Sequence, residues 1–455
     1  MGSSSLDIDG VRSLFDFGDR VVTNNAASTQ PPVAVLAFYR DLVRTYENVH
    51  RGQSDASLAT TERFEAAFDT IAAWLGASGR STISVHRNTT EAINSVMYTL
   101  LTEFRDGDNV VTTLMEHNSN YVPWYGLCRE ILPRFGVRVE CRLARFHHDT
   151  GELDLEHLGS LVDDRTKLVA CTGASNFLGT KPPLAAVRAI ADASGYVQPW
   201  GESRSLLLVD GAQFVPTTAV DVQALDADYL AFSFHKLFAP FGVGVLYAKE
   251  SLRRRSLPFL YGGDMIAEGQ VTPQAVGYNE LPWKFSAGTP NILGVIASAQ
   301  TLRFLADLAD PTAPRLFGTE DPLPRAVVTG AVARISEHSA RLTDAAIEEL
   351  STVPGIRIYG PPHGSPRAPL VAFTVAGKSP FALAEALNAR GVESRAGCHC
   401  ATLAHHDLGL DPPASCRLSF AVYNTDADVD RAVSAVRDAV RGRVGRQPRR
   451  SGAGS

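Results

Sequence analysis

Apolar positions recur with two different periods along the chain, and segments of the two kinds alternate. Short apolar runs bounded by polar residues predict strands at 81–85, 109–113, 168–172 and 206–209. Longer segments with apolar residues three and four positions apart predict helices at 91–101 and 183–194. Strands that alternate with helices are typical of a mostly parallel sheet with crossover helices. We therefore expect an α/β fold with a large domain of this kind.

The pattern then restarts as a smaller α+β unit. A helix begins near Ile335, and strands at 356–359 and 370–375, a helix at 380–390 and a last helix from Asp426 follow. A segment rich in proline and acidic residues, 310–324, separates this unit from a long helix after Pro290. The expected boundaries are an N-terminal arm at 1–22, a large domain at 23–305, an inserted surface loop at 306–330, a small C-terminal domain at 331–440 with which the N-terminal segment is a candidate to pack, and a disordered tail at 441–455.

Composition narrows the classes of partner and compartment. The 455 residues are 45% hydrophobic and 20% charged, which is enough to bury a large core. The net charge of -6 gives no basic surface for nucleic acid or for an anionic membrane, so neither is expected as a partner. No signal peptide and no run of about 18 apolar residues is evident, and we expect a cytoplasmic protein. Six cysteines are few for this length and lack zinc-site spacing, which favours reduced thiols and no metal.

Lys236 is the first residue that indicates chemistry. The segment from Asp228 to Lys236 leaves an apolar strand and enters a polar turn, and a second apolar strand follows at 243–247. A single lysine at a strand end is more often simply solvated. A desolvated lysine, however, forms imines with aldehydes, and enzymes that use pyridoxal phosphate pair that lysine with an acid on the pyridine nitrogen.

Asp210 is the candidate acid. It follows the apolar run 206–209, and in an open parallel sheet the ligand crevice lies at the carboxyl ends of the strands. An isolated aspartate after a strand is more often a turn or helix cap, but together with Lys236 it becomes a partner for the pyridine nitrogen. Gln213 comes three residues later and is placed to donate to the phenolic oxygen of the cofactor.

A phosphate site is predicted at a helix N-terminus. Thr89 and Thr90 follow Asn88 directly before the helix at 91–101, and free amides with short hydroxyl side chains bind anions there. Plain N-capping is compatible with this interpretation because the capped amides are themselves the anion site. Ser233 and His235 are further candidate phosphate donors. His117 follows a strand and is a candidate to lie flat on the pyridine ring, although a lone histidine is more often structural.

Several of these stretches together resemble one known family. The chain is similar to class V aminotransferases of the cysteine desulfurase and selenocysteine lyase group over roughly residues 20–440, through the segments 24–29, 88–94, 116–120, 175–180, 209–213, 233–236, 285–290 and 417–425. The resemblance implies pyridoxal phosphate as cofactor, Lys236 as the Schiff-base lysine, and the fold of that group, with a seven-stranded-type sheet wrapped by helices.

The resemblance also implies roles for residues that the pattern alone does not single out. It implies a homodimer in which Thr289 of one chain reaches the phosphate held by the other. It places Asn176 near the phenolic oxygen and the substrate, Arg417 on the substrate carboxylate and Arg395 at a second position near the substrate. Cys400 stands at the position of the cysteine that forms a persulfide, whereas Cys128, Cys141 and Cys171 are interpreted as structural.

The implied reaction converts L-cysteine to L-alanine and leaves the sulfur on Cys400. His399 or His117 would hold the proton, and His399, Arg395 or Arg417 would favour the Cys400 thiolate. In an extended loop both Cys398 and Cys400 would point the same way. The short interval from Cys400 to Arg417 resembles the subgroup that usually depends on a sulfur-acceptor protein.

Some features depart from the family pattern and leave alternatives open. Cys398 stands where histidine is usual, Phe234 stands where a small residue is common, and the insertions at 198–204 and 310–324 indicate a specialised paralogue. The alternatives are C–S β-elimination, epimerisation or transamination on a related sulfur or selenium amino acid, and, from another class, a non-catalytic sulfur carrier or scaffold that has kept only the fold.

Overall fold

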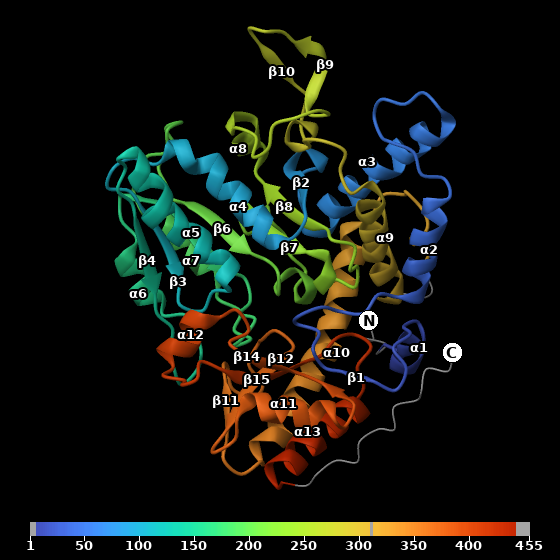
Figure 1. Ribbon diagram of the computed structural model, residues 1–455, viewed down its shortest axis with the longest axis vertical. Helices are drawn as coiled ribbons and strands as arrows, with labels where there is room; N and C mark the ends of the chain where they lie inside the picture. The colour runs from blue at the N-terminus through green and yellow to red at the C-terminus, as the bar shows by residue number, and fades with distance from the viewer. Residues whose placement is uncertain (1–5, 310–312, 443–455) are drawn as a thin grey trace.

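A seven-stranded sheet forms the centre of the computed structural model, which describes residues 6–309 and 313–442 (Figure 1). The strand order is β2-β8-β7-β6-β5-β3-β4. Strand β8 is antiparallel to both neighbours, and all other pairs are parallel. The expected mostly parallel sheet is confirmed. Its strands are β2 (Ile83–His86), β3 (Asn109–Thr113), β4 (Glu140–Ala144), β5 (Thr166–Thr172), β6 (Leu206–Asp210), β7 (Tyr229–Ser233) and β8 (Gly244–Ala248).

Both faces of this sheet are buried, which explains why its strands are apolar at successive positions. Val110 and Leu168 pack on the face covered by helix α4, whereas the next residues, Val111 and Val169, pack on the opposite face. We call this sheet and its helices the large unit. Its helices are α2 (Val33–Val43), α3 (Asp55–Leu75), α4 (Thr89–Leu100), α5 (Val122–Gly126), α6 (Leu155–Leu161), α7 (Leu184–Asp192), α8 (Glu250–Arg255) and α9 (Ile292–Ala309).

A four-stranded antiparallel sheet of order β11-β12-β15-β14 forms the small unit. The N-terminal segment joins this unit because β1 (Val21–Val22) pairs with β13 (Val392–Glu393) and Arg12 forms an ion pair with Asp428. The other elements of this region are α1 (Ile8–Ser13), α10 (Arg325–Ser351), β11 (Ile356–Tyr359), β12 (Leu370–Val375), α11 (Pro380–Asn388), β14 (Arg395–Gly397), α12 (Thr402–Asp407), β15 (Ser415–Ser419) and α13 (Asp426–Val440).

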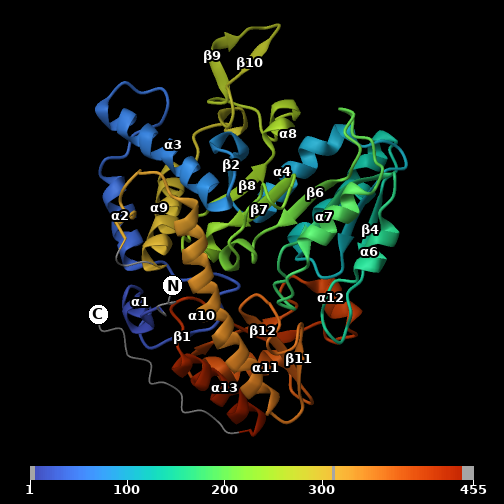
Figure 2. The same ribbon diagram turned by 180° about the vertical axis from the view of Figure 1, so that it is seen from behind.

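Helix α10 links the two units and begins at Arg325, earlier than the predicted Ile335 (Figure 2). The irregular segment before it is therefore shorter than the expected 306–330. It is also less superficial than expected, because Asp307 accepts hydrogen bonds from the backbone N–H groups of Leu316 and Phe317 and the side chain of Leu323 is buried. The predicted tail lies outside the described residues from position 443 onward.

Two further segments extend from the large unit. Strands β9 (Ile266–Val271) and β10 (Val276–Tyr278) form a hairpin that projects away from both units (Figures 1 and 2). The insertion at 198–204 folds back through a bridge between Val197 and Ser203. Within residues 6–309 and 313–442, no helix combines the length and apolar character needed to cross a membrane.

Candidate active site

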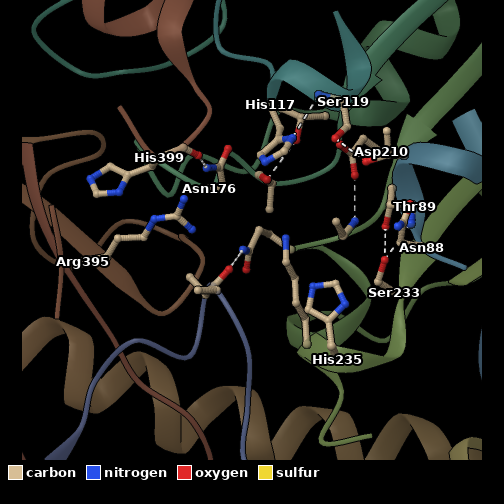
Figure 3. Close-up of a pocket in the computed structure, with 18 of the residues that line it drawn as sticks. Asn88, Thr89, His117, Ser119, Asn176, Asp210, Ser233, His235, Arg395 and His399 are labelled. Atoms are coloured by element: carbon tan, nitrogen blue, oxygen red, sulfur yellow. Dashed lines mark hydrogen bonds between the residues drawn. The ribbon is translucent and has the colours of Figure 1, made fainter. Parts of the chain in front are cut away.

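A cavity of about 240 Å³ lies where the parallel strands of the large sheet end and the small unit begins (Figure 3). Thr172, Asp210 and Ser233 are the last residues of the neighbouring strands β5, β6 and β7, and all three line it. Arg395 and His399 of the small unit face them across the cavity. This is the position at which open parallel sheets bind ligands.

Most residues singled out from the sequence meet in this cavity. Eleven of the thirteen predicted site residues line it: Thr89, Thr90, His117, Asn176, Asp210, Gln213, Ser233, His235, Lys236, Arg395 and Arg417. Thr289 and Cys400 do not. Sequence reasoning missed Ala26, Ala27, Ser119, Thr172, Ala174 and Ala212, and it did not place His399 on the cavity wall.

Asp210 and Lys236 form the charged centre of the cavity. Asp210 is 4% exposed and accepts a hydrogen bond from the backbone N–H of Ala212 at 2.9 Å. Burial raises the pKa of Asp210, while the nearby charge of Lys236 opposes that change. Burial lowers the pKa of Lys236 to about 8, and the charge of Asp210 partly offsets the effect. Lys236 therefore has a substantial neutral fraction at mildly alkaline pH and can act as a nucleophile or base.

The N-terminus of α4 forms one end of the cavity. Asn88 caps this helix through a hydrogen bond that its Oδ1 accepts from the backbone N–H of Glu91. The backbone N–H of Thr89 donates to Ser233 Oγ at 2.7 Å, and the hydroxyls of Thr89 and Ser233 are 2.6 Å apart. A Cβ atom on Gly244 of β8 would lie 2.5 Å from backbone atoms of Asn88, so this approach requires glycine. Helix N–H groups and hydroxyls together suit a phosphate.

Two neutral histidines and a missed serine complete this end. Thr90 Oγ1 and Ser119 Oγ are 2.7 Å apart. Burial lowers the pKa of His235 to about 4 and that of His117 to about 3. The Nδ1 atom of His117 accepts from the backbone N–H of Ser119 at 3.0 Å, which leaves the ring proton on Nε2. A neutral imidazole is suited to stack on an aromatic ring.

Glu116 supports the turn that carries His117, and sequence reasoning missed it. Its carboxyl group accepts hydrogen bonds from Thr113 Oγ1 at 2.7 Å, from Asn120 Nδ2 at 2.7 Å and from the backbone N–H of Thr172 at 2.9 Å. Burial raises the pKa of Glu116 to about 8, against the effect of these donors. The carboxyl group thus joins the ends of β3 and β5 directly behind the cavity.

Arg417 is buried with unsatisfied donors at the small-unit side of the cavity. It is 1% exposed, and its Nη1 donates to the main-chain oxygen of Asn176 at 2.6 Å. Among the described residues, its Nε and Nη2 atoms and the Oδ1 atom of Asn176 have no hydrogen-bond partner. Burial lowers the pKa of Arg417 to about 9, and the neighbouring Arg395 adds to this effect. A buried guanidinium with free donors suits a ligand carboxylate.

Cys398 and Cys400 lie in a tight turn beside the cavity, and the extended loop assumed from the sequence is wrong. The backbone N–H of Ala401 donates to the Cys398 carbonyl at 2.8 Å, while His399 and Cys400 have φ values of 52° and 58°. Arg395 Nη2 lies 3.9 Å from Cys400 Sγ. The expectation that a cationic His399 favours the thiolate is also wrong, because burial lowers the pKa of His399 far below its ordinary value.

Thr289 is exposed and lies away from the cavity of its own chain. Its neighbours Gly288 and Pro290 instead line a separate depression together with Arg87 and Phe259. The structure thus places Thr289 where only another chain's cavity could receive it.

Comparison with known proteins agrees with this geometry. A model of the family described as "Aminotransferase class-V" matches residues 21–311 and 325–432. The chain belongs to the class V aminotransferase family. Relatives in this family include a cysteine desulfurase of Haloferax volcanii, 38% identical over 461 residues that cover 96% of this chain and 98% of the relative. A probable cysteine desulfurase of Halobacterium salinarum is 36% identical over 444 residues, which cover 95% and 97% of the two chains.

Solved structures with similar folds carry related names. Cysteine desulfurase CsdA (S-sulfonic acid) from Escherichia coli has a TM-score of 0.80 and 30% identity, with 96% of this chain and 99% of that chain covered. The apo cysteine desulfurase of Thermococcus onnurineus NA1 has a TM-score of 0.83 and 28% identity, with 97% and 100% covered. These matches span both units of the class V fold.

The cavity also fits the cofactor that the family resemblance implies. Pyridoxal phosphate needs an anion site, an acid for its pyridine nitrogen and an amine for its aldehyde. The α4 N-terminus, Asp210 and Lys236 supply these three groups within one cavity. The unpartnered Oδ1 of Asn176 and the free donors of Arg417 remain for the substrate.

Proposed function

We propose that the protein is a pyridoxal-phosphate-dependent cysteine desulfurase, which converts L-cysteine to L-alanine and transfers the sulfur to Cys400 as a persulfide. The observation that carries this proposal is the unpaired, buried guanidinium of Arg417 in the same cavity as Asp210 and Lys236, with a half-exposed thiol at Cys400 next to Arg395. The names of the relatives support the same conclusion.

The residues that would hold the cofactor divide by its parts. Thr89, Thr90, Ser233, His235 and the α4 amides hold the phosphate, with Thr289 of a second chain completing that site in a homodimer. Asp210 holds the pyridine nitrogen, His117 lies against the ring, Gln213 and Asn176 face the phenolic oxygen, and Lys236 takes the aldehyde. When bound, pyridoxal phosphate supplies an electron sink for the substrate α-carbon.

The substrate is bound by its carboxylate. Arg417 donates to that carboxylate from Nε and Nη2, its two atoms without a partner, while Nη1 remains on Asn176. Arg395 adds a second positive charge at the same side of the cavity. Once the substrate amine has displaced Lys236, the freed lysine amine, with a pKa lowered to about 8, accepts the proton from the α-carbon.

Sulfur transfer then depends on Cys400. Its thiolate attacks the substrate sulfur, a new S–S bond forms, the C–S bond breaks, and the substrate β-carbon takes up a proton to give alanine. Arg395, with Nη2 at 3.9 Å from Sγ, stabilises the thiolate. His117 retains its Nε2 proton and faces the cavity, so it is the better candidate than His399 to supply this proton. A sulfur-acceptor protein would remove the sulfur from the exposed side.

The identity of the products tests this function. Purified protein loaded with pyridoxal phosphate and given L-cysteine should form alanine, with sulfide released in the presence of a thiol reductant. Formation of pyruvate and ammonia in place of alanine would instead support C–S β-elimination, the alternative that requires no thiol.

A further inference from the structure

Cys398 and Cys400 occupy the first and third positions of the turn at 398–401. Residues two apart are separated by at most about 7 Å between Cα atoms in an extended chain, and a turn shortens this separation. A disulfide requires a Cα separation of about 4.4–6.8 Å. The turn therefore brings the two cysteines into the range in which their sulfur atoms can bond.

The turn is held in this shape by surrounding residues. Its three carbonyl groups all accept hydrogen bonds: that of Cys398 from Ala401 N–H at 2.8 Å, that of His399 from Asn176 Nδ2 at 2.7 Å, and that of Cys400 from Asn118 N–H at 2.6 Å. Left-handed φ values at two successive non-glycine residues are unfavourable and persist only when neighbours enforce them. The relative position of the two thiols is thus fixed by the walls of the active site.

These two cysteines also differ from the other four in reactivity. Cys128, Cys171 and Cys416 are buried, and burial raises the pKa of the thiols of Cys128, Cys141 and Cys416 to about 12. Cys398 and Cys400 are both half-exposed. Thr402 Oγ1 donates to Cys398 Sγ at 3.5 Å, and the Arg395 guanidinium lies beside Cys400 Sγ. Each sulfur therefore has a donor that favours the thiolate.

We propose that Cys398 is a resolving thiol for the persulfide on Cys400, an activity that rests on the proposed function. The Cys398 thiolate attacks Sγ of Cys400, a Cys398–Cys400 disulfide forms, and the bond to the outer sulfur breaks so that it leaves as hydrosulfide. The two cysteine sulfurs are oxidised and the outer sulfur is reduced by the same two electrons. Hydrosulfide is a favourable leaving group because its conjugate acid is acidic for a thiol-like group.

The consequence is release of sulfide without an acceptor protein. The disulfide blocks Cys400 until a thiol reductant, such as glutathione, restores both cysteines. The enzyme would then supply free sulfide only as fast as thiols reduce it. This property distinguishes a turn with two cysteines from a turn in which Cys400 is the single thiol.

A single-turnover experiment tests the proposal. Holoenzyme given L-cysteine without reductant should form alanine and an equal amount of sulfide in one burst, and then stop with Cys398 and Cys400 linked. The Cys398→Ser variant should form the same alanine but keep the sulfur as a persulfide on Cys400. Cys141→Ser, the matched control, should behave as wild type. A wild-type persulfide that persists beside a free Cys398, or an unchanged sulfide burst in Cys398→Ser, would overturn the proposal.

A second measurement does not depend on turnover. In a glutathione redox buffer, peptide mass spectrometry should find an intramolecular Cys398–Cys400 disulfide, with fragment ions that exclude a link to Cys416. Glutathione bound to Cys400 beside a free Cys398 would contradict the proposal. Absence of alanine in the first experiment would refute the proposed function, and the redox measurement would still decide on the thiol pair.

Discussion

Arg417 Nη1 donates to the main-chain oxygen of Asn176 at 2.6 Å, and this contact joins the small sheet to the loop after β5 of the large sheet. The remaining guanidinium donors, Nε and Nη2, have no partner among the described residues. An unsatisfied buried cation is unfavourable unless a ligand pairs with it. The contact therefore orients Arg417 for a carboxylate that the substrate brings.

Arg417→Ala should weaken binding of L-cysteine by roughly 2–4 kcal/mol, because it removes a charge-assisted bidentate contact in a desolvated site. Cysteamine, which lacks the carboxylate, should be affected far less. The measurement is the dissociation constant of each ligand for wild type and variant, with Arg417→Lys as an intermediate case. An equal loss for the two ligands would rule out the carboxylate contact.

Lys236→Ala should still bind pyridoxal phosphate, because the phosphate and pyridine contacts come from Thr89, Ser233 and Asp210. It should lose turnover and the covalent attachment that borohydride makes permanent. Mass spectrometry of borohydride-treated wild type should find the cofactor on the peptide that contains Lys236. Attachment to another lysine would show that the assignment is wrong.

The attachment of cofactor to the apo-protein should depend on pH. The Lys236 amine must be neutral to react, and burial lowers its pKa to about 8, so the rate should rise as the pH increases through about 8. In Asp210→Asn the opposing negative charge is lost, so the inflection should move to lower pH. Stopped-flow absorbance measures both. A wild-type inflection near the ordinary lysine value of about 10.4 would contradict the burial of this amine.

The sequence predicted the elements that depend on local pattern. Apolar runs marked the strands, and the polar residues at their ends, Asp210 and Lys236, met in the cavity as expected because parallel strands end at one edge. The early start of α10 was missed because 325–334 contains Gly330, small residues and no clear apolar face. The β9–β10 hairpin is exposed and polar, so it carries no core pattern.

Long-range contacts decide the features that could not be predicted. The turn at 398–401 depends on donors from Asn118 and Asn176, which are far away in the sequence. Burial on all sides makes His399 neutral, and no sequence pattern reports that burial. Ser119 was recognisable only as the hydroxyl in the segment 116–120, and its pairing with Thr90 needs the folded structure.

Thr289 should link cofactor retention to association. It is exposed and lies outside its own cavity, so we expect it to complete the phosphate site of a partner chain. Thr289→Ala should release pyridoxal phosphate more readily while the dimer persists in sedimentation. Ser286→Ala in the same segment is the control. A fully active monomer that retains its cofactor would refute this arrangement.

Replacement of Cys400 tests the central claim most directly. Cys400→Ala given L-cysteine should keep the absorbance of bound cofactor but form no alanine, because no thiol remains to take the sulfur. Cys398→His, which introduces the residue usual in the family, should preserve much of the alanine formation. The measurement is the rate of alanine formation from L-cysteine by the wild type and the two variants. Loss in Cys400→Ala alone is the result we predict, and a Cys400→Ala enzyme that still forms alanine at the wild-type rate would contradict the account.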